Sequence, residues 1–160
     1  MGQARQLTWA VWPVFVGLEM AVNLDDGLFL DLGDAVVTAP VKASATWSSG
    51  DMLKLDSGYL TVCTAGDIPY GVAVATLATA DSPASNGDVE ALVYVGGNNH
   101  YQYPPDSGTA AITLVGKKCD VGGAASADID ASVDGALLIV GVDVDANKVI
   151  VQLANAFVGV

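Results

Sequence analysis

The chain has 160 residues, of which 52% are hydrophobic and only 15% are charged, so it is long enough to bury a core without disulfide or metal crosslinks. Its 18 acidic and 6 basic residues give a net charge of −12, and the cations are scattered, which argues against binding to nucleic acid. The mean hydropathy of +0.46 excludes disorder over most of the chain. With so few charges to cover a globule, we expect part of the surface to be hidden in an assembly.

Residues 1–24 are predicted to form an extended N-terminal arm. Trp9, Trp12 and Phe15 are spaced three apart as on a helix, but Pro13 and the neighbouring valines favour an extended segment. The three rings predict a contact with another subunit or shell, and the alternative is that the arm folds back as an edge strand over its own core. No uncharged apolar run reaches the length that spans a bilayer, so no membrane partner is expected.

The rest of the chain is predicted to be all-β. Glu occurs twice against sixteen Asp, helix formers are scarce, and β-branched and turn residues are common. Apolar alternation predicts strands that are separated by turns at 56–58, 65–67 and 145–147. The expected strands cover residues 52–55, 59–63, 70–77, 89–95, 110–115, 137–144 and 148–153, with an exposed excursion at 96–108.

A weak internal echo suggests two related β-units, residues 35–95 and 109–155, within a single domain of residues 25–160. In each unit a Gly-led segment is followed by a second one, at 50–55 and 71–74 and again at 116–121 and 141–144. The two units could close one small barrel. The alternative is coincidence, because Gly, Val and Asp are abundant throughout this chain.

No pattern of residues indicates catalysis, a cofactor or a metal. His100 is the only histidine, and the chain has no G-x-S-x-G nucleophile motif. Residues 143–147 begin like a calcium loop, but Lys148 and Ala154 stand where such a loop needs Gly and Glu. Cys63 and Cys119 predict two buried thiols or a single bridge. We therefore expect a protein that is not an enzyme.

The excursion offers a second candidate contact. Amide and aromatic side chains alternate there, a chemistry that suits either sugar binding or protein contacts. The predicted exposed contact residues are Asn98, Asn99, His100, Tyr101 and Tyr103.

Several segments resemble the head decoration (cement) proteins of tailed bacteriophages. The resemblance is one of strand-turn-strand pattern over residues 35–155, and it is carried by residues 49–62, 65–67, 71–73, 135–140 and 149–153. It implies a small β-barrel or β-tulip-like domain that binds the outer capsid surface of the virion and clamps neighbouring major capsid subunits, commonly as a homotrimer.

On this resemblance the expected partners are the major capsid protein and further copies of the chain. The protein would be made in the host cytoplasm and would end on the phage head. Two alternatives stay open: a glycan-binding or adhesion module that uses residues 96–108, and a β-protein associated with the tail or its fibres.

Overall fold

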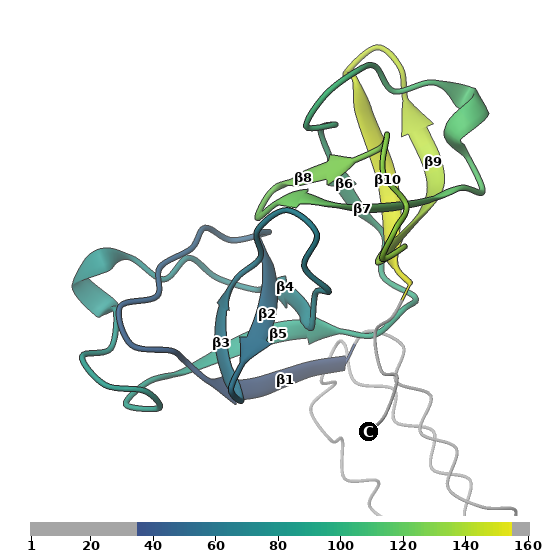
Figure 1. Ribbon diagram of the computed structural model, residues 1–160. Coiled ribbons are helices and arrows are strands. Elements are labelled where there is room, and N and C mark those ends of the chain that lie inside the picture. Colours follow the sequence, from purple (N-terminus) through teal and green to yellow (C-terminus); the bar gives the residue numbers. More distant parts are fainter. Residues whose placement is uncertain (1–34, 155–160) are drawn as a thin grey trace, which may run out of the picture. The chain divides into compact units, whose positions relative to one another are not determined.

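The computed structural model describes residues 35–154, and this part of the chain is all-β, as predicted (Figure 1). Ten strands are joined by turns and two short 3-10 helices. The strands are β1 (Ala35–Pro40), β2 (Met52–Asp56), β3 (Tyr59–Val62), β4 (Gly71–Ala73), β5 (Glu90–Val95), β6 (Tyr101–Tyr103), β7 (Lys118–Gly123), β8 (Ser126–Asp128), β9 (Leu137–Asp143) and β10 (Lys148–Leu153). The 3-10 helices are η1 (Thr79–Asp81) and η2 (Ile112–Leu114).

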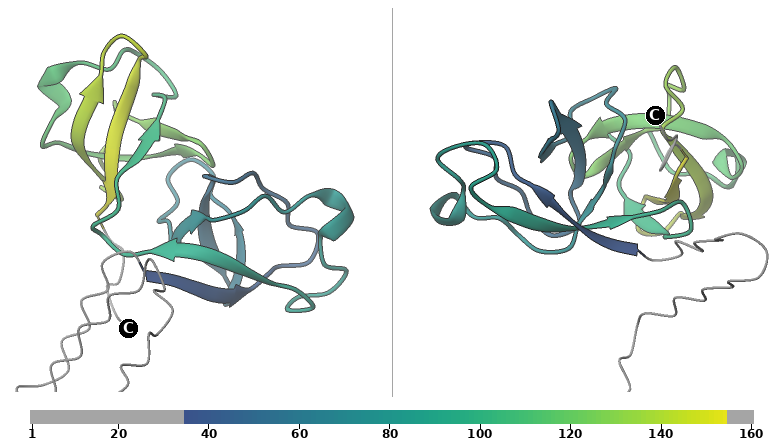
Figure 2. Two further views of the ribbon diagram at one scale, coloured as in Figure 1. Left: turned by 180° about the vertical axis from the view of Figure 1, so that it is seen from behind. Right: turned by 90° about the horizontal axis from the view of Figure 1, so that it is seen from below.

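The strands form two five-stranded antiparallel sheets that share one topology. The first sheet has the order β1-β5-β4-β2-β3, and the second has the order β6-β10-β9-β7-β8. Adding five to each label of the first order gives the second. We call residues 35–95 the first repeat and residues 101–153 the second repeat; Figure 2 shows each sheet from two further directions.

The strand registers fix which residues of the repeats are equivalent. Leu53 pairs with Gly71 in the first repeat, and Cys119 pairs with Leu137 in the second. The backbone hydrogen bonds agree with this alignment. The equivalent bonds are Gly50 N–H to Ala73 O (2.9 Å) and Gly116 N–H to Ile139 O (2.8 Å), and Ala73 N–H to Asp51 O and Ile139 N–H to Lys117 O (both 2.9 Å).

Gly50 and Gly116 make the same turn before the second strand of each repeat. Their φ angles are +90° and +85°, a region that side chains with a Cβ rarely adopt. The glycine is therefore required at both positions by the turn that the two repeats share.

Neither sheet closes into a complete barrel. In each repeat the first and third strands meet through a single parallel bridge, Val41 with Leu60 and Pro105 with Ala127. The strands therefore form two open sheets, each with its first and third strands bridged at one point, and not the closed barrel that was predicted. The predicted arm, residues 1–24, lies outside the described residues.

Two buried clusters fill the molecule. One lies inside the first sheet and includes Leu53, Leu60 and Val93. The other lies inside the second sheet but also contains Met52, Cys63 and Val72 of the first sheet. The second repeat therefore covers part of the outward side of the first sheet.

Several segments differ from the sequence prediction. β1, β7 and β8 were not predicted, and the strand expected at residues 70–77 covers only Gly71–Ala73. Residues 110–115 were expected to be a strand, but they contain η2 and leave Ile112 72% exposed, because no neighbouring strand pairs with them. The excursion at 96–108 contains β6, which pairs with β10 through Tyr103 and Val149. The second sheet therefore begins at Tyr101, earlier than the expected residue 109.

Candidate interaction surface

An apolar row crosses the outward side of the first sheet. Val36 pairs with Tyr94, Tyr94 with Val72, and Val72 with Met52, and residues paired in this way point to the same side of a sheet. Val93 and Val95, which alternate with Tyr94, point to the opposite side and are fully buried. The apolar residues on the outward side are thus additional to those that build the first core.

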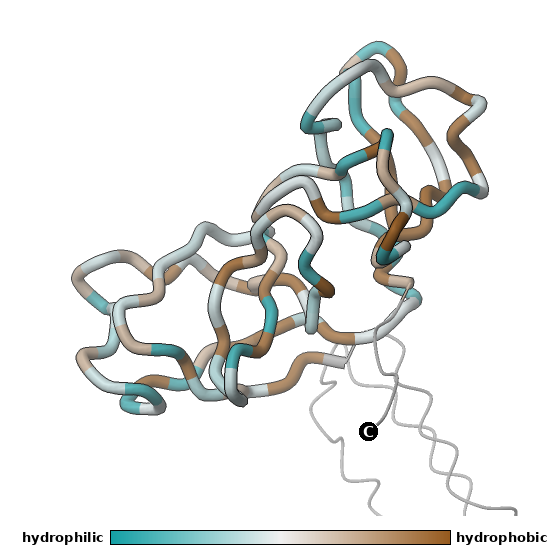
Figure 3. Tube along the Cα trace, viewed as in Figure 1, coloured by the Kyte–Doolittle hydropathy of each residue, from teal (hydrophilic) through white to brown (hydrophobic). Residues whose placement is uncertain are grey.

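The second repeat covers one half of this row and leaves the other half exposed. Met52 and Val72 are 0% and 2% exposed, whereas Val36 is 41% and Tyr94 is 38% exposed. Leu92, which lies on the same side one pair further along β5, is 50% exposed. We call Val36, Leu92 and Tyr94 the exposed apolar face; Figure 3 shows the hydrophobic residues of β1 and β5 in brown.

Polar residues interrupt the equivalent row of the second repeat, although Leu138 and Ile150, the counterparts of Val72 and Leu92, are also apolar. The row that matches Met52, Val72 and Tyr94 consists of Lys118, Leu138 and Gln152, as the registers show. An apolar outward side is therefore no requirement of this topology. Contiguous exposed apolar side chains are candidate interaction sites in soluble proteins, and the contrast with the interrupted row of the second repeat singles out the exposed apolar face.

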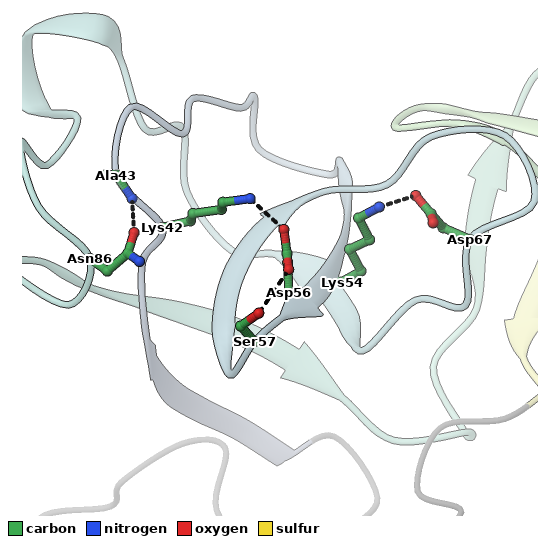
Figure 4. Close-up of polar contacts among 7 residues, drawn as sticks. All are labelled: Lys42, Ala43, Lys54, Asp56, Ser57, Asp67 and Asn86. Carbon is green, nitrogen blue, oxygen red and sulfur yellow. Dashed lines mark hydrogen bonds and ion pairs between the residues drawn. The ribbon is translucent and has the colours of Figure 1, made fainter.

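The basic residues of the first repeat are both held in ion pairs (Figure 4). Lys42 contacts Asp56, and the Nζ atom of Lys54 lies 2.7 Å from Oδ2 of Asp67. The Lys42 ammonium and the Ser57 hydroxyl lower the pKa of Asp56. Since the repeat has two lysines against six acidic residues, its remaining charges are all negative.

The Lys54–Asp67 pair fixes the turn that follows β3. Burial alone would raise the pKa of Asp67, but the Lys54 ammonium and the backbone and hydroxyl donors of Thr64 outweigh it and hold that pKa below its ordinary value. The same contact raises the pKa of Lys54. This turn carries Ile68, which is 53% exposed.

Asp120 does the equivalent work in the second repeat. It is 4% exposed, and its carboxylate accepts hydrogen bonds from the backbone N–H groups of Val133 (2.9 Å), Asp134 (3.0 Å) and Gly135 (2.7 Å). Buried carboxylates need such donors to offset the loss of hydration. The role is structural, because every contact of the carboxylate is with the loop of its own repeat.

The structure separates the residues that the sequence analysis grouped in one exposed contact. Asn98 and His100 are exposed and Asn99 is partly buried, before β6 begins. Tyr103 was expected to be exposed but is 5% exposed, because β6 turns its ring into the second core, where its hydroxyl donates to Gly50 O at 2.8 Å. Burial raises the pKa of Tyr103, and Tyr101 is packed against the same core.

Trp9, Trp12 and Phe15, the other predicted contact residues, lie outside the described residues. Cys63 and Cys119 are buried free thiols, and burial raises the pKa of each to about 12. Within residues 35–154, no group of three His, Cys, Asp or Glu side chains is placed to hold a metal ion. The same part of the chain contains no helix long and apolar enough to cross a membrane.

No family model matches the chain, and neither the curated proteins nor the solved structures contain a significant match.

The exposed apolar face was not predicted from the sequence. Alternation along residues 89–95 indicates a strand, but β1 was not recognised, so its partner could not be known. The sequence does contain a signal. Leu92 and Tyr94 alternate with Val93 and Val95, so both faces of this strand are apolar. A strand that is apolar on both faces is usually covered on both sides.

Proposed function

We propose that this protein is a structural, protein-binding component of a bacteriophage head, a decoration protein that docks on the major capsid lattice. The single observation that carries the proposal is the exposed apolar face on β1 and β5, part of an apolar row that Lys118 and Gln152 interrupt at the equivalent positions of the second repeat. The resemblance of residues 49–62 to decoration proteins supports the same function, and these residues form the β2–β3 hairpin with the turn before it.

The charge of the chain supports a role on the outside of a head. A net charge of −12 disfavours contact with packaged DNA. Many copies on one lattice multiply a modest interface through avidity. The proposal includes Trp9, Trp12 and Phe15 as further contact residues with the shell or a sister subunit.

The glycan-binding alternative has less support. This alternative depended on the aromatic rings of Tyr101 and Tyr103, and the ring of Tyr103 is buried in the second core. Asn98 and His100 remain exposed, but the ring of Tyr101 beside them is partly buried and stacked on that of Tyr103, with the centroids 6.4 Å apart.

Binding to purified empty, expanded heads tests the proposal. We expect the wild-type chain to co-sediment with heads and to raise their disruption temperature, and Leu92→Asp to weaken binding by at least about tenfold, because it places a charge in the centre of the face. Ile150→Asp, at the equivalent position of the second repeat, is the matched control and should bind normally. Failure of the wild-type chain to bind heads would refute the function, and equal binding by Leu92→Asp would remove the face from it.

A further inference from the structure

At the edge of the first sheet beside the exposed apolar face, backbone groups of β1 have no partner among residues 35–154. Val41 N–H donates to Val89 O on the side of β5, whereas Lys42 N–H donates to Leu60 O on the side of β3. Because backbone groups alternate along a strand, the even-numbered positions of β1 face away from β5. Val36 and Thr38 therefore present N–H and C=O groups that no described residue pairs with.

This edge lacks the usual protection against pairing with another chain. β1 spans Ala35–Pro40 and contains no charged residue, and only its last position is a proline. Natural edge strands are commonly short or carry charge or proline. The equivalent strand of the second repeat, β6, has three residues and is followed by Pro104 and Pro105.

The charges beside the edge define the chemistry of the partner. Glu90 pairs with Pro40 and lies on the same side as Leu92 and Tyr94, so it is the charged member of this surface. Lys42 and Lys54 are committed to ion pairs. A second copy of this acidic chain would add like charge, whereas a segment with Lys or Arg would be attracted.

The area of the face also favours an extended segment. Three side chains that are each about half exposed provide much less than the ~800 Å² per partner of a stable interface. Strand addition gains main-chain hydrogen bonds as well and takes its specificity from alternate side chains.

We propose that an extended strand of the partner protein, with alternating apolar and basic residues, adds to the edge of β1 that no described residue covers. Its apolar side chains would pack beside Val36 and extend the apolar row that continues to Tyr94 and Leu92 on β5, while a long Lys or Arg side chain would reach across β1 toward Glu90. The inference rests on the proposed function, since it names how the partner engages the same face. It assigns the partner by chemistry, and the like charge of a second copy argues against self-association at this edge.

Head binding by two proline variants tests the backbone part. Thr38→Pro removes an outward N–H of β1, and Gln102→Pro makes the same change at the equivalent position of β6. We expect Thr38→Pro to lose most of its affinity for expanded heads and Gln102→Pro to keep it. If Thr38→Pro binds as wild type while Leu92→Asp does not, the face functions without strand addition and the inference is wrong, although the function stands.

A peptide titration of the full chain tests the chemistry without heads. The probes are an eight-residue peptide of alternating Val and Lys and its Val and Glu counterpart, followed through the amide NMR signals of β1. We expect the Val–Lys peptide alone to shift Val36 and Thr38, and the shift to disappear at high salt. Glu90→Lys, which leaves the backbone intact and copies Lys148 of the second repeat, should reverse the preference.

Three results would overturn the inference: no response of β1 to either peptide, equal response to both, or concentration-dependent self-association of the wild-type chain that Thr38→Pro abolishes. The last would show that a second copy occupies the edge. Each of these is measured on the isolated chain, so it is independent of whether heads are bound.

Discussion

Lys54 and Asp120 occupy equivalent positions in the two repeats and hold the following loop with opposite charges. Lys54 reaches the carboxylate of Asp67, whereas Asp120 accepts three backbone N–H groups. In each repeat this position holds a polar side chain that connects the second strand (β2 or β7) to the loop that precedes the fourth strand (β4 or β9). The charge of this side chain can be positive or negative, because the loop offers a carboxylate in the first repeat and backbone N–H groups in the second.

Asp120→Ala is predicted to destabilise the protein by about 2–4 kcal/mol, because it removes a buried carboxylate and leaves three backbone N–H groups, one of them buried, without their acceptor. Urea unfolding at neutral pH measures the loss. Lys54→Met, at the equivalent but more exposed site, should cost under about 1 kcal/mol. Equal losses in the two variants would contradict the structural role assigned to Asp120.

The Lys54–Asp67 pair predicts a specific pH dependence. The folded-state pKa of Asp67 lies below 3.8, so its contribution is complete above that pH and is lost as the pH falls through the folded-state value. The folded-state pKa of Lys54 lies above 10.5, so its contribution is complete below that pH and is lost as the pH rises further.

The stability difference between wild type and Lys54→Met should therefore be flat at intermediate pH and shrink at both extremes. Urea midpoints across the pH range provide the measurement. Lys117→Met, at an exposed lysine that takes part in neither ion pair, serves as a control for the general effect of removing one positive charge. A difference that grows on acidification would show that the assignment of the pair is wrong.

At the scale of elements, the strands that alternate clearly were predicted from the sequence and those defined by long-range pairing were not. The hairpin of β9 and β10 was confirmed, and Asn147 has the left-handed backbone expected there, with a φ of +49°. β1, β6, β7 and β8 were missed. β7 and β8 lack a clear apolar alternation, and β1 and β6 are edge strands whose partner is distant in the chain. Local sequence carries no record of such a partner.

The internal echo was informative in its first half only. Gly50 and Gly116 are equivalent and make the same turn, so that part of the pattern reflects the fold. Gly71 is equivalent to Leu137, and Gly141 is not its counterpart. The second half of the pattern was therefore a coincidence of composition, and strand pairing was needed to expose the repeat.

Gly71 marks the close approach of β4 to β5. A Cβ at this position would lie 2.4 Å from Tyr94 O and 2.4 Å from a methyl group of Val93. Gly71→Ala is predicted to cost about 1–3 kcal/mol through overpacking, as measured by thermal or urea unfolding. Gly97→Ala, where the nearest atom would be 3.5 Å away, is the matched control and should be close to neutral.

At the scale of the whole molecule, the repeats are joined by shared packing and by hydrogen bonds from Met52 N–H to Ala124 O (2.6 Å) and from Gly66 N–H to Val121 O (2.8 Å). The Tyr103 hydroxyl adds a side-chain bond to Gly50 O. A common cluster of this kind couples the two sheets, so we expect them to unfold in one transition.

Tyr103→Phe tests this coupling, because it removes the hydroxyl and keeps the ring. We predict that the free energy of unfolding falls by about 1 kcal/mol and that amide hydrogen exchange accelerates in both repeats, near Gly50 as well as near Tyr103. Acceleration confined to β6 and β10 would indicate that the repeats open independently.

The pairing of the first and last strands within a repeat has a mechanical consequence. Ala35 lies opposite Val95, so the chain enters and leaves the first repeat at the same end of the β1–β5 ladder. A pull between these two positions would load the hydrogen bonds one after another and peel β1 away like a zipper. A force directed along the β1 axis would instead shear all the β1–β5 hydrogen bonds at the same time. The strand would resist far more force in that direction.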